Sequence, residues 1–381
     1  MKLKHICIVA ENYPSEGTPS FPFVQQLAYS LSNENVKCSV IAPQSITAAL
    51  LHKKELLPEH SSDLTPEGRI VEVFRPVYVT FSDTKIDFLQ KVAYGSMRQA
   101  IGKALNQLDN VDCIYCYFWH IGLTVAQVVK DNCIPLFVQA SECWLTVKDF
   151  MRKSQYVNRI QGVICASGKN RDESIQAGLT DQSKTTVIVN GYRSDEFYAK
   201  DKRVCRDILK IPRDAFVVAF VGGFIERKGI TQLCEALERF NDVDSIFIGS
   251  GEIQPTCRNI VFAGKVAHNE IGTYLNAADV FVLPTRAEGC CNAIIEALAC
   301  GLPVISSNKS FNDEILNDEC SFRIDEASVD MVYEAISKIK EDISLRERMH
   351  IAALDMAKSL TIEHRAKAIK AFVEEKANNA D

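Results

Sequence analysis

The sequence predicts an α/β protein of two doubly wound, Rossmann-like domains, each with a parallel sheet between helices. Three observations predict this class. Short apolar runs recur with helix-length segments between them. Several of these runs are apolar throughout, which is typical of parallel strands buried on both faces. The series of runs also stops and starts again near the middle of the 381-residue chain, and alternating strands and helices favour doubly wound sheets.

The expected strands form two series. The first series consists of residues 5–10, 38–42, 70–74, 113–118, 136–139, 163–166 and 186–189. The second consists of residues 216–221, 245–248, 259–262, 280–283 and 303–306.

A polar stretch separates the two series. The segment Asn190–Phe197 closes the first, and a new apolar run begins at Phe216. We place the domain boundary near residue 196, with domains at 1–196 and 197–361 and a charged helix from residue 362 to the end. The length of the chain also suits two domains of ordinary size.

The composition excludes several classes of protein. Hydrophobic residues make up 47% and charged residues 24% of the chain, the balance of a globular protein with a large core. The sequence contains no run of 18 apolar residues, so we expect no membrane-spanning helix, and the N-terminus lacks the pattern of a signal peptide. Most of the 14 cysteines lie in apolar runs, so we expect free thiols and a cytoplasmic location.

The charge is distributed unevenly along the chain. Residues 1–195 carry 20 basic and 19 acidic residues, a net charge of +1, and the rest carries 23 and 30, a net charge of −7. This balance argues against a nucleic-acid partner, which needs a basic face. Peripheral contact of the first half with the inner face of a membrane stays open. Phe88, Leu89, Val92 and Ile101 would share the apolar face of a helix there, although such a stripe more often packs into a core.

The most informative segment follows the expected strand at 280–283. It places Glu288 and Gly289 in a loop, Asn292 at the start of a helix and Glu296 within that helix. The glycine permits close approach of a ligand, and the helix start binds phosphate. The two carboxylates are acceptors for hydroxyl groups. This layout fits a ligand with a sugar, a diphosphate and a ribose, although a capped helix with a solvated glutamate fits the sequence as well.

A hydrolytic role for the same two carboxylates is disfavoured. Eight helical residues rise about 12 Å. Glycosidase carboxyl pairs lie about 5 Å apart in retaining enzymes and under about 10 Å apart in inverting ones. The spacing of Glu288 and Glu296 therefore argues against glycoside hydrolysis.

Two further loops follow strands in the second half. The first contains Gly222, Gly223, Arg227 and Lys228, and glycines next to basic residues suggest a phosphate clamp. The second, Gly249–Gly251, resembles part of a dinucleotide fingerprint but lacks the third glycine. An Asp-x-Asp sequence at 242–244 precedes a strand, so we do not read it as a metal site, and we expect no metal or other cofactor.

Together these pieces resemble the retaining glycosyltransferases of two-domain GT-B architecture, family four (glycosyl transferases group 1). The family's two glutamates, with seven residues between them, match Glu288 and Glu296. Its glycine-rich clamp with a lysine matches Gly222 and Lys228, and its Asn-Gly connector matches the segment that begins at Asn190. One departure is Gly223, which stands where relatives usually have arginine, and Arg227 is our candidate for the missing charge.

The resemblance implies a role for each matched residue. Lys228 would bind the donor diphosphate, Glu288 the transferred sugar and Glu296 the ribose, and Val266 would lie near the base. It also implies that the first domain binds the acceptor, that the second binds the nucleotide sugar, and that the last helix packs back on the first domain. The expected donor-binding residues are Gly17, Gly222, Gly223, Arg227, Lys228, Val266, Glu288, Gly289, Cys290, Cys291, Asn292 and Glu296.

The first half matches the family less closely. Tyr117 stands where many relatives have a histidine near the reacting centre, and His120 follows three residues later. We expect Lys228, Glu288 and His120 to be catalytic, and Tyr117 and Glu142 to lie on the acceptor side. An ordinary histidine beside a tryptophan explains His120 equally well, and a plain turn glycine explains Gly17.

The resemblance implies transfer of a hexose from a nucleoside-diphosphate sugar to a hydroxyl of a glycan or lipid-linked glycan, with retained configuration, in bacterial surface polysaccharide synthesis. The departing diphosphate would itself take the acceptor proton. Two alternatives stay open, namely a nucleotide-sugar epimerase on the same scaffold and a catalytically silent relative. The sequence leaves the sugar, the base, the acceptor and the oligomeric state undetermined.

Overall fold

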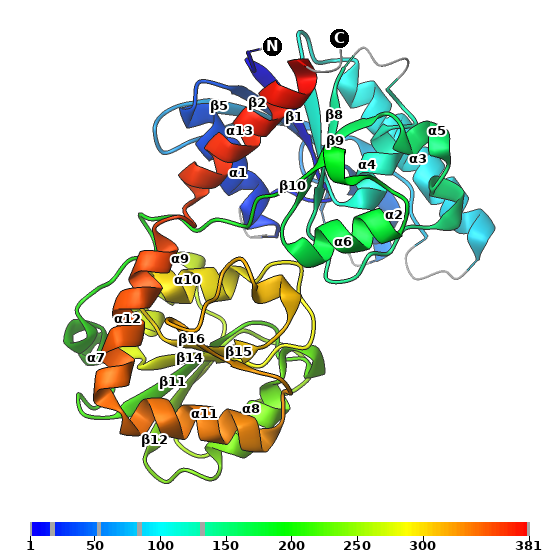
Figure 1. Ribbon diagram of the computed structural model, residues 1–381. Helices are drawn as coiled ribbons and strands as arrows, with labels where there is room; N and C mark the ends of the chain where they lie inside the picture. Colours follow the sequence, from blue (N-terminus) through cyan, green and yellow to red (C-terminus); the bar gives the residue numbers. More distant parts are fainter. Residues whose placement is uncertain (1, 16–19, 52–54, 82–85, 130–133, 379–381) are drawn as a thin grey trace. The chain divides into compact units, whose positions relative to one another are not determined.

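The computed structural model describes residues 2–15, 20–51, 55–81, 86–129 and 134–378. The chain divides into two compact units, which we call the front unit and the back unit. Each unit holds a largely parallel sheet with helices on both faces, so the predicted α/β class is confirmed (Figure 1). The front unit comprises Met1–Ala166, Asn170–Ile188 and Arg365–Asp381, and the back unit comprises Ser167–Lys169 and Val189–His364.

The front unit is built on an eight-stranded sheet in the order β10-β9-β8-β7-β1-β2-β5-β4. All neighbouring pairs are parallel except β4 and β5. The strands are β1 (His5–Val9), β2 (Lys37–Ile41), β4 (His60–Leu64), β5 (Ile70–Phe74), β7 (Cys113–Tyr117), β8 (Leu136–Ala140), β9 (Ile160–Cys165) and β10 (Thr185–Val187). A separate two-stranded sheet pairs β3 (Gln44–Ser45) with β6 (Val77–Tyr78).

Helices close this sheet with one apolar core on each face. Helix α1 begins with a proline, which suits the first turn of a helix because the missing N–H has no partner there. It packs its apolar face with α13 into one core, and α3 and α4 pack into the other. The helices are α1 (Pro22–Asn33), α2 (Ile46–Leu51), α3 (Asp87–Leu105), α4 (Trp119–Val125), α5 (Ser154–Val157), α6 (Gly168–Gln176) and α13 (Ile362–Asn378).

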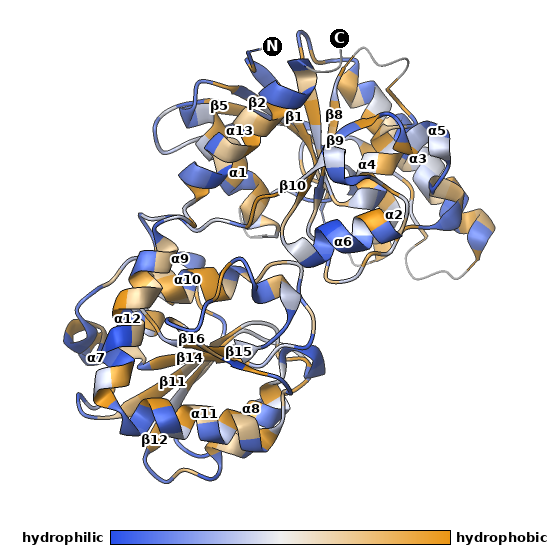
Figure 2. Ribbon diagram, viewed as in Figure 1, coloured by the Kyte–Doolittle hydropathy of each residue, from blue (hydrophilic) through white to orange (hydrophobic). Residues whose placement is uncertain are grey.

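The back unit has a six-stranded parallel sheet in the order β13-β12-β11-β14-β15-β16. Its strands are hydrophobic, whereas its helices carry both hydrophobic and hydrophilic residues, as expected when helices cover a buried sheet (Figure 2). The strands are β11 (Phe216–Val221), β12 (Val243–Ile248), β13 (Ile260–Gly264), β14 (Val280–Leu283), β15 (Val304–Ser307) and β16 (Ser321–Ile324).

Helices α8 and α11 pack together on the back sheet, and α10 packs against α9 and α12. Helices α8 and α11 carry buried apolar residues at intervals of three and four, so each packs one stripe against the core, whereas residues 294–299 of α10 are all buried. The helices are α7 (Lys202–Leu209), α8 (Ile230–Leu237), α9 (His268–Ala277), α10 (Asn292–Ala299), α11 (Val329–Glu341) and α12 (Ile343–Ala357).

Each sheet has one position at which the strand order reverses. In the front sheet the chain runs from β1 to its neighbour β2, and the strand on the other side of β1 is β7. In the back sheet β11 lies between β12 and β14 in the same way. Ligands of open α/β sheets bind beyond the carboxyl ends of the strands at such switch points.

The structure corrects some details of the expected elements. Strand β4 was not predicted, because its residues alternate between exposed and half-buried positions at the sheet edge and form no apolar run. Strand β16 was also missed, since it has four residues and includes an arginine. The shared apolar face expected for α3 is wrong for Ile101, which is fully buried, whereas the Phe88 side chain on the same helix is 70% exposed.

Within the described residues, no helix is both long enough and apolar enough to cross a membrane.

Candidate functional site

The candidate site lies at the switch point of the back sheet. The loop after β11 carries Arg227 and Lys228, and the loop after β14 carries Glu288. A backbone hydrogen bond joins the two loops, in which Arg286 N–H donates to the Arg227 carbonyl oxygen over 2.8 Å. Residues that are about sixty positions apart in the sequence therefore meet at one edge of the sheet.

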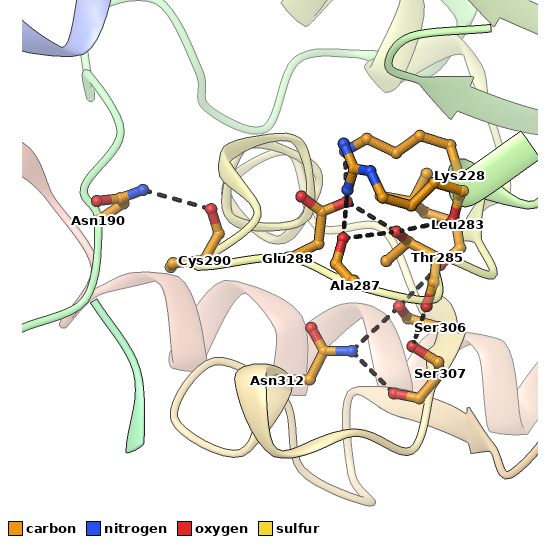
Figure 3. A network of polar contacts seen from close by, with 11 residues as sticks. Asn190, Lys228, Leu283, Thr285, Ala287, Glu288, Cys290, Ser306, Ser307 and Asn312 are labelled. Atoms are coloured by element: carbon orange, nitrogen blue, oxygen red, sulfur yellow. Dashed lines mark hydrogen bonds and ion pairs between the residues drawn. The ribbon is translucent and has the colours of Figure 1, made fainter. Parts of the chain in front are cut away.

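The Glu288 carboxylate is the centre of this arrangement. Its Oε1 atom lies 2.6 Å from Nζ of Lys228 and 3.0 Å from Nη1 of Arg227. The same oxygen accepts a hydrogen bond of 2.7 Å from Oγ1 of Thr285. Glu288 is buried, and a buried carboxylate left without partners would cost several kcal/mol. The two cations and the hydroxyl hold this charge in place (Figure 3).

The loop that holds Glu288 is itself supported by buried polar contacts. Ser307 Oγ donates to the Thr285 carbonyl over 2.6 Å, and Ser306 Oγ donates to the Leu283 carbonyl over 2.8 Å. Asn312 Nδ2 in turn donates to the Ser307 carbonyl over 2.8 Å. Figure 3 shows this chain of contacts running from Asn312 to the glutamate. The position of Glu288 is therefore set by strands β14 and β15 together.

Two glycines allow the loops to pack this closely. Gly229 follows Lys228 with φ of 72°, and a Cβ atom there would overlap the Pro284 carbonyl oxygen. Gly249, in the third loop noted in the sequence, would overlap the Gly222 carbonyl if it carried a side chain. The Gly249–Gly251 loop thus lies directly against the loop after β11.

Helix α10 begins beside Glu288. The cap position is Cys291 and Asn292 is the first helical residue, so Asn292 lies at the start of the helix as expected but does not cap it. The Asn292 side chain instead accepts a hydrogen bond of 2.7 Å from Nδ2 of Asn190. The first N–H groups of a helix lack partners within the helix, so this end favours an anion.

Glu296 lies one turn further along α10 and is buried. Its Oε1 atom lies 3.4 Å from Nε2 of His268, and Nδ1 of the same ring lies 3.0 Å from Oε2 of Glu196. Burial alone would lower the pKa of His268, but hydrogen bonds and charges from these two carboxylates raise it to about 10. The imidazole is therefore protonated at neutral pH and holds both carboxylates.

The protonation states of Lys228 and Cys291 determine the remaining charge of the site. Burial lowers the pKa of Lys228, but the neighbouring Cys291 and Glu288 outweigh it, and the pKa lies above its ordinary value. Burial raises the pKa of Cys291 to about 11, so this thiol is neutral. The site thus carries two cations against one carboxylate at Glu288.

The other residues expected at the donor site are placed as follows. Gly222 N–H donates to the Ile248 carbonyl over 2.9 Å, and the Gly223 carbonyl accepts from Ile225 N–H over 2.9 Å. Val266 and Cys290 are partly buried against the back core. Gly289 lies in the loop between Glu288 and α10. Gly17 lies outside the described residues.

In the front unit the three expected residues play different parts. Tyr117 is buried, with its ring 5.3 Å from that of Phe23. Glu142 accepts hydrogen bonds from Trp119 N–H over 2.6 Å and from Ser141 N–H over 2.9 Å, so it fixes the start of α4. Burial raises the pKa of Glu142 despite these bonds.

The third residue, His120, faces an acid. Its Nε2 atom lies 2.7 Å from Oε1 of Glu11, a residue that the sequence did not single out. Glu11 follows β1 and His120 follows β7, so the pair lies at the switch point of the front sheet.

Sequence reasoning missed several residues of the back site. Thr285 and Asn312 carried no signal, because a hydroxyl and an amide that support a loop belong to no motif. Asn190 did carry one, since the Asn-Gly connector was recognised without a role for its side chain. His268 stands next to the Val266 segment and could have been found as the first residue of a helix that follows a strand.

Comparison with known proteins identifies the class. Residues 201–356 match the family Glycosyl transferases group 1. The chain is 26% identical over 349 residues to the "Putative teichuronic acid biosynthesis glycosyltransferase TuaC" of Bacillus subtilis, covering 87% of each chain. It is 30% identical over 200 residues to an Escherichia coli UDP-Gal:alpha-D-GlcNAc-diphosphoundecaprenol alpha-1,3-galactosyltransferase, covering 47% of this chain and 51% of that protein.

Solved structures share the fold. Sucrose-phosphate synthase from Thermosynechococcus elongatus matches with a TM-score of 0.76 and 17% identity over 99% of this chain and 100% of that one. HepE from Anabaena, solved in complex with UDP, matches with a TM-score of 0.69 and 18% identity over 98% and 100% of the two chains.

The chain contains two sheets, each with one switch point, and it matches solved structures over nearly its whole length. These observations define a protein of GT-B architecture. These matches show that the protein is a glycosyltransferase, and the segment that resembles glycosyl transferases group 1 contains Arg227, Lys228, Thr285 and Glu288.

Proposed function

We propose that the protein transfers a hexose from a nucleoside-diphosphate sugar to a hydroxyl of a glycan or lipid-linked glycan, with retention of configuration. The product would belong to a bacterial surface polysaccharide. One observation carries the proposal: two cations, Lys228 and Arg227, converge on the buried Glu288 beside the first turn of α10. The named activities of the relatives support the same class of donor and acceptor.

The charges of this arrangement suit a diphosphate. Lys228 and Arg227 together carry two positive charges, and the Glu288 carboxylate balances one of them. The remaining charge and the N–H groups at the start of α10 would stabilise the diphosphate as its bond to the sugar breaks. Charge placed in advance around a leaving group is usually a large part of catalysis.

The two glutamates suit hydroxyl groups at either end of the donor. Glu288 Oε1 is held by three donors, which makes it a poor nucleophile and leaves the carboxylate suited to orient sugar hydroxyls. Glu296, fixed by His268, would accept hydrogen bonds from the ribose diol. The diphosphate oxygen would then take the proton from the acceptor hydroxyl.

The front unit offers a surface for a lipid-linked acceptor. Phe88 on α3 is 70% exposed, and Leu50 and Leu51 on α2 are 75% and 74% exposed. Hydrogen bonds tie the two helices to the same segment, since Thr47 donates to the Thr80 carbonyl and Val79 N–H donates to Ser96 Oγ. We propose that this face rests on an anionic membrane.

A donor panel tests the activity. Uridine and guanosine diphosphate sugars are added singly, and the unfolding midpoint is measured, because a bound donor raises stability by mass action. The stabilising donor is then incubated with glycan acceptors, and proton NMR of the product gives its anomeric configuration. Conversion of the donor alone would indicate an epimerase, and binding without turnover would indicate a silent relative. An inverted product would overturn the retaining mechanism.

A further inference from the structure

The back unit contains a cavity at the opposite edge of its sheet from Glu288. Asp279 directly precedes β14 and Pro303 directly precedes β15, and both residues line this cavity. Glu288 instead follows β14. The cavity therefore lies at the amino ends of the strands, whereas the proposed donor site lies beyond their carboxyl ends.

Helix ends and apolar side chains form much of the wall. Helices α9 and α10 end at the cavity with Ala278 and Cys300, and α12 contributes Ile343. Leu302 and Pro303 add apolar area. The volume of about 610 Å³ lies within the range of about 300–1,000 Å³ that ligand pockets occupy. Since Ile343 is 60% exposed, a ligand here would remove apolar surface from water, which favours binding.

Hydrogen bonds hold the walls of the cavity in place. The buried Asn276 side chain of α9 accepts from Lys200 N–H over 2.7 Å and donates to the Tyr198 carbonyl over 3.0 Å. On the other side, Nδ1 of His350 donates to the Gly301 carbonyl just after α10 over 2.6 Å. A Cβ atom at Gly301 would overlap the imidazole ring. A cavity with walls fixed in advance loses little conformational freedom when it binds a ligand.

The charge of Asp279 in this cavity is already balanced. Its Oδ2 atom lies 2.7 Å from Nη2 of the buried Arg206 and accepts a hydrogen bond of 2.8 Å from Val217 N–H. Arg206 Nε also donates to the Ala277 carbonyl over 2.9 Å. Nζ of Lys202 lies 2.8 Å from Oδ1 of the same carboxylate. One carboxylate therefore lies between two cations, and Lys202, whose side chain is 44% exposed, carries the excess charge.

The other charges favour a ligand with a single negative charge. Lys200, Arg346 and Glu347 also line the cavity, so with the three charged residues just described four bases stand against two acids. The C-terminal ends of α9 and α10 offset part of this excess, because each carries about half a negative charge. Burial raises the pKa of Cys300 to about 12, so its thiol is neutral. The sum is about one positive charge, which complements a monoanion.

We propose that this cavity is a second binding site, which takes a small molecule with an apolar body and one anionic group, a carboxylate or a phosphate ester. The anionic group pairs with Lys200 and Lys202, and the apolar body packs against Leu302, Pro303 and Ile343. A nucleotide sugar does not fit this description, because its sugar and ribose are polar. The assignment does not rest on the proposed function of the Glu288 arrangement.

Saturation-transfer NMR titrations on the full chain test the site. The anionic probes are octanoate and octyl phosphate, and 1-octanol and octylammonium carry the same alkyl chain without a negative charge. We expect at least one anionic probe to receive saturation from the protein and to bind more tightly than 1-octanol, with octylammonium the weakest. A response to only one of the two anions identifies the head group that the site prefers.

Variants separate the contribution of charge from that of packing. Lys200→Gln combined with Lys202→Gln should weaken binding of the anionic probe about fivefold, as expected for the loss of two partly exposed ion pairs, and should leave the affinity for 1-octanol unchanged. Ile343→Ser should weaken binding of both probes. The fold should survive, because Asp279 keeps Arg206. Lys358→Gln removes an exposed lysine near the end of α12 and is the control.

Three results would overturn the assignment. The first is the absence of saturation for both anions, and the second is an octylammonium affinity equal to that of the anions. The third is an anion affinity that is unchanged in the double lysine variant, or a signal that free UDP or GDP abolishes, because the probe would then bind elsewhere. Thermal melting confirms that each variant is folded. Calorimetric titration of UDP and GDP is run in parallel, and failure of both to bind would count against the donor function while leaving the octanoate result intact.

Discussion

Nε2 of His268 lies 3.4 Å from Oε1 of Glu296, the carboxylate that we assign to the ribose. The other ring nitrogen lies 3.0 Å from Oε2 of Glu196, so one imidazole connects α9 and α10 to the segment that enters the back unit. A protonated ring between two carboxylates fixes their orientation more firmly than either contact alone. We therefore infer that His268 is a positioning residue of the proposed donor site.

His268→Ala is expected to weaken binding of the preferred nucleoside diphosphate about fivefold, the equivalent of one hydrogen bond of about 1 kcal/mol. Calorimetric titration measures the loss. His268→Gln, which can still donate to Glu296, should recover part of it, and the exposed His364→Ala is the control. Equal affinity in wild type and His268→Ala would show that the contact between His268 and Glu296 does not contribute to nucleotide binding.

The same contact predicts how stability depends on pH. The folded pKa of His268 is about 10, above its ordinary value of 6.5, so protonation favours the folded state. The contribution is complete below about pH 6.5 and is lost as pH rises through 10. Since the ring is more than a third exposed, we expect about 1 kcal/mol at most. Urea unfolding of wild type and His268→Ala should differ at pH 6 and converge near pH 10, and a constant difference would contradict this assignment.

Removal of either cation at Glu288 tests the assignment of the diphosphate. Lys228→Ala and Arg227→Ala should each lower kcat/KM about a hundredfold, as loss of a group that stabilises transition-state charge does in other enzymes. Each variant should still fold, because Glu288 keeps the other cation and Thr285. Lys358→Ala, which removes an exposed lysine, is the control. Near-normal rates in both variants would refute the assignment.

Much of the back site could be predicted because its residues lie in loops directly after apolar strands. Glu288 and Lys228 follow β14 and β11, and strands of this kind are visible in the sequence. His268 could not be assigned a role, since its partners lie 72 and 28 residues away and only folding brings them together. Glu11 was passed over for the same reason, because its significance depends on the pairing of β1 with β7.

The limits of fold prediction have a similar origin. Parallel strands that are buried on both faces can be recognised in the sequence as apolar runs. The edge strand β4 was missed because its residues are mostly polar and alternate between exposed and half-buried positions. The role of Tyr117 stays a prediction, and its burial against Phe23 leaves His120 as the more accessible of the two residues.

Thr285→Val tests the support beneath the glutamate. The substitution keeps the shape of the side chain but removes the 2.7 Å hydrogen bond to Glu288 Oε1. We expect a loss of about 1 kcal/mol in the free energy of unfolding and a reduction of kcat by about fivefold to tenfold, with little change in KM. Thr285→Ser restores the hydroxyl and should restore kcat. A loss of stability without any effect on kcat would make Thr285 a purely structural residue.

Chelation tests whether a metal ion takes part. Lys228 and Arg227 already place two positive charges where the diphosphate would lie, so we expect the initial rate to stay within about twofold after dialysis against EDTA. The rate is measured before and after addition of Mg²⁺ or Mn²⁺ to the dialysed protein. Activity that vanishes with EDTA and returns with either ion would show that the two side chains are insufficient.

Exposed apolar side chains on α2 and α3 predict membrane binding by the front unit. Phe88→Ser should lower partitioning onto vesicles of phosphatidylglycerol and phosphatidylcholine about tenfold, because partial burial of a large apolar side chain stabilises binding by about 1.5 kcal/mol. Leu50→Ser should have a similar effect, and the two changes together a larger one. Ile351→Ser in the back unit, where the side chain is 67% exposed, is the matched control and should leave partitioning unchanged. Sedimentation with the vesicles measures the bound fraction. Equal losses for Phe88 and Ile351 would show that apolar exposure alone, and not this face, decides binding.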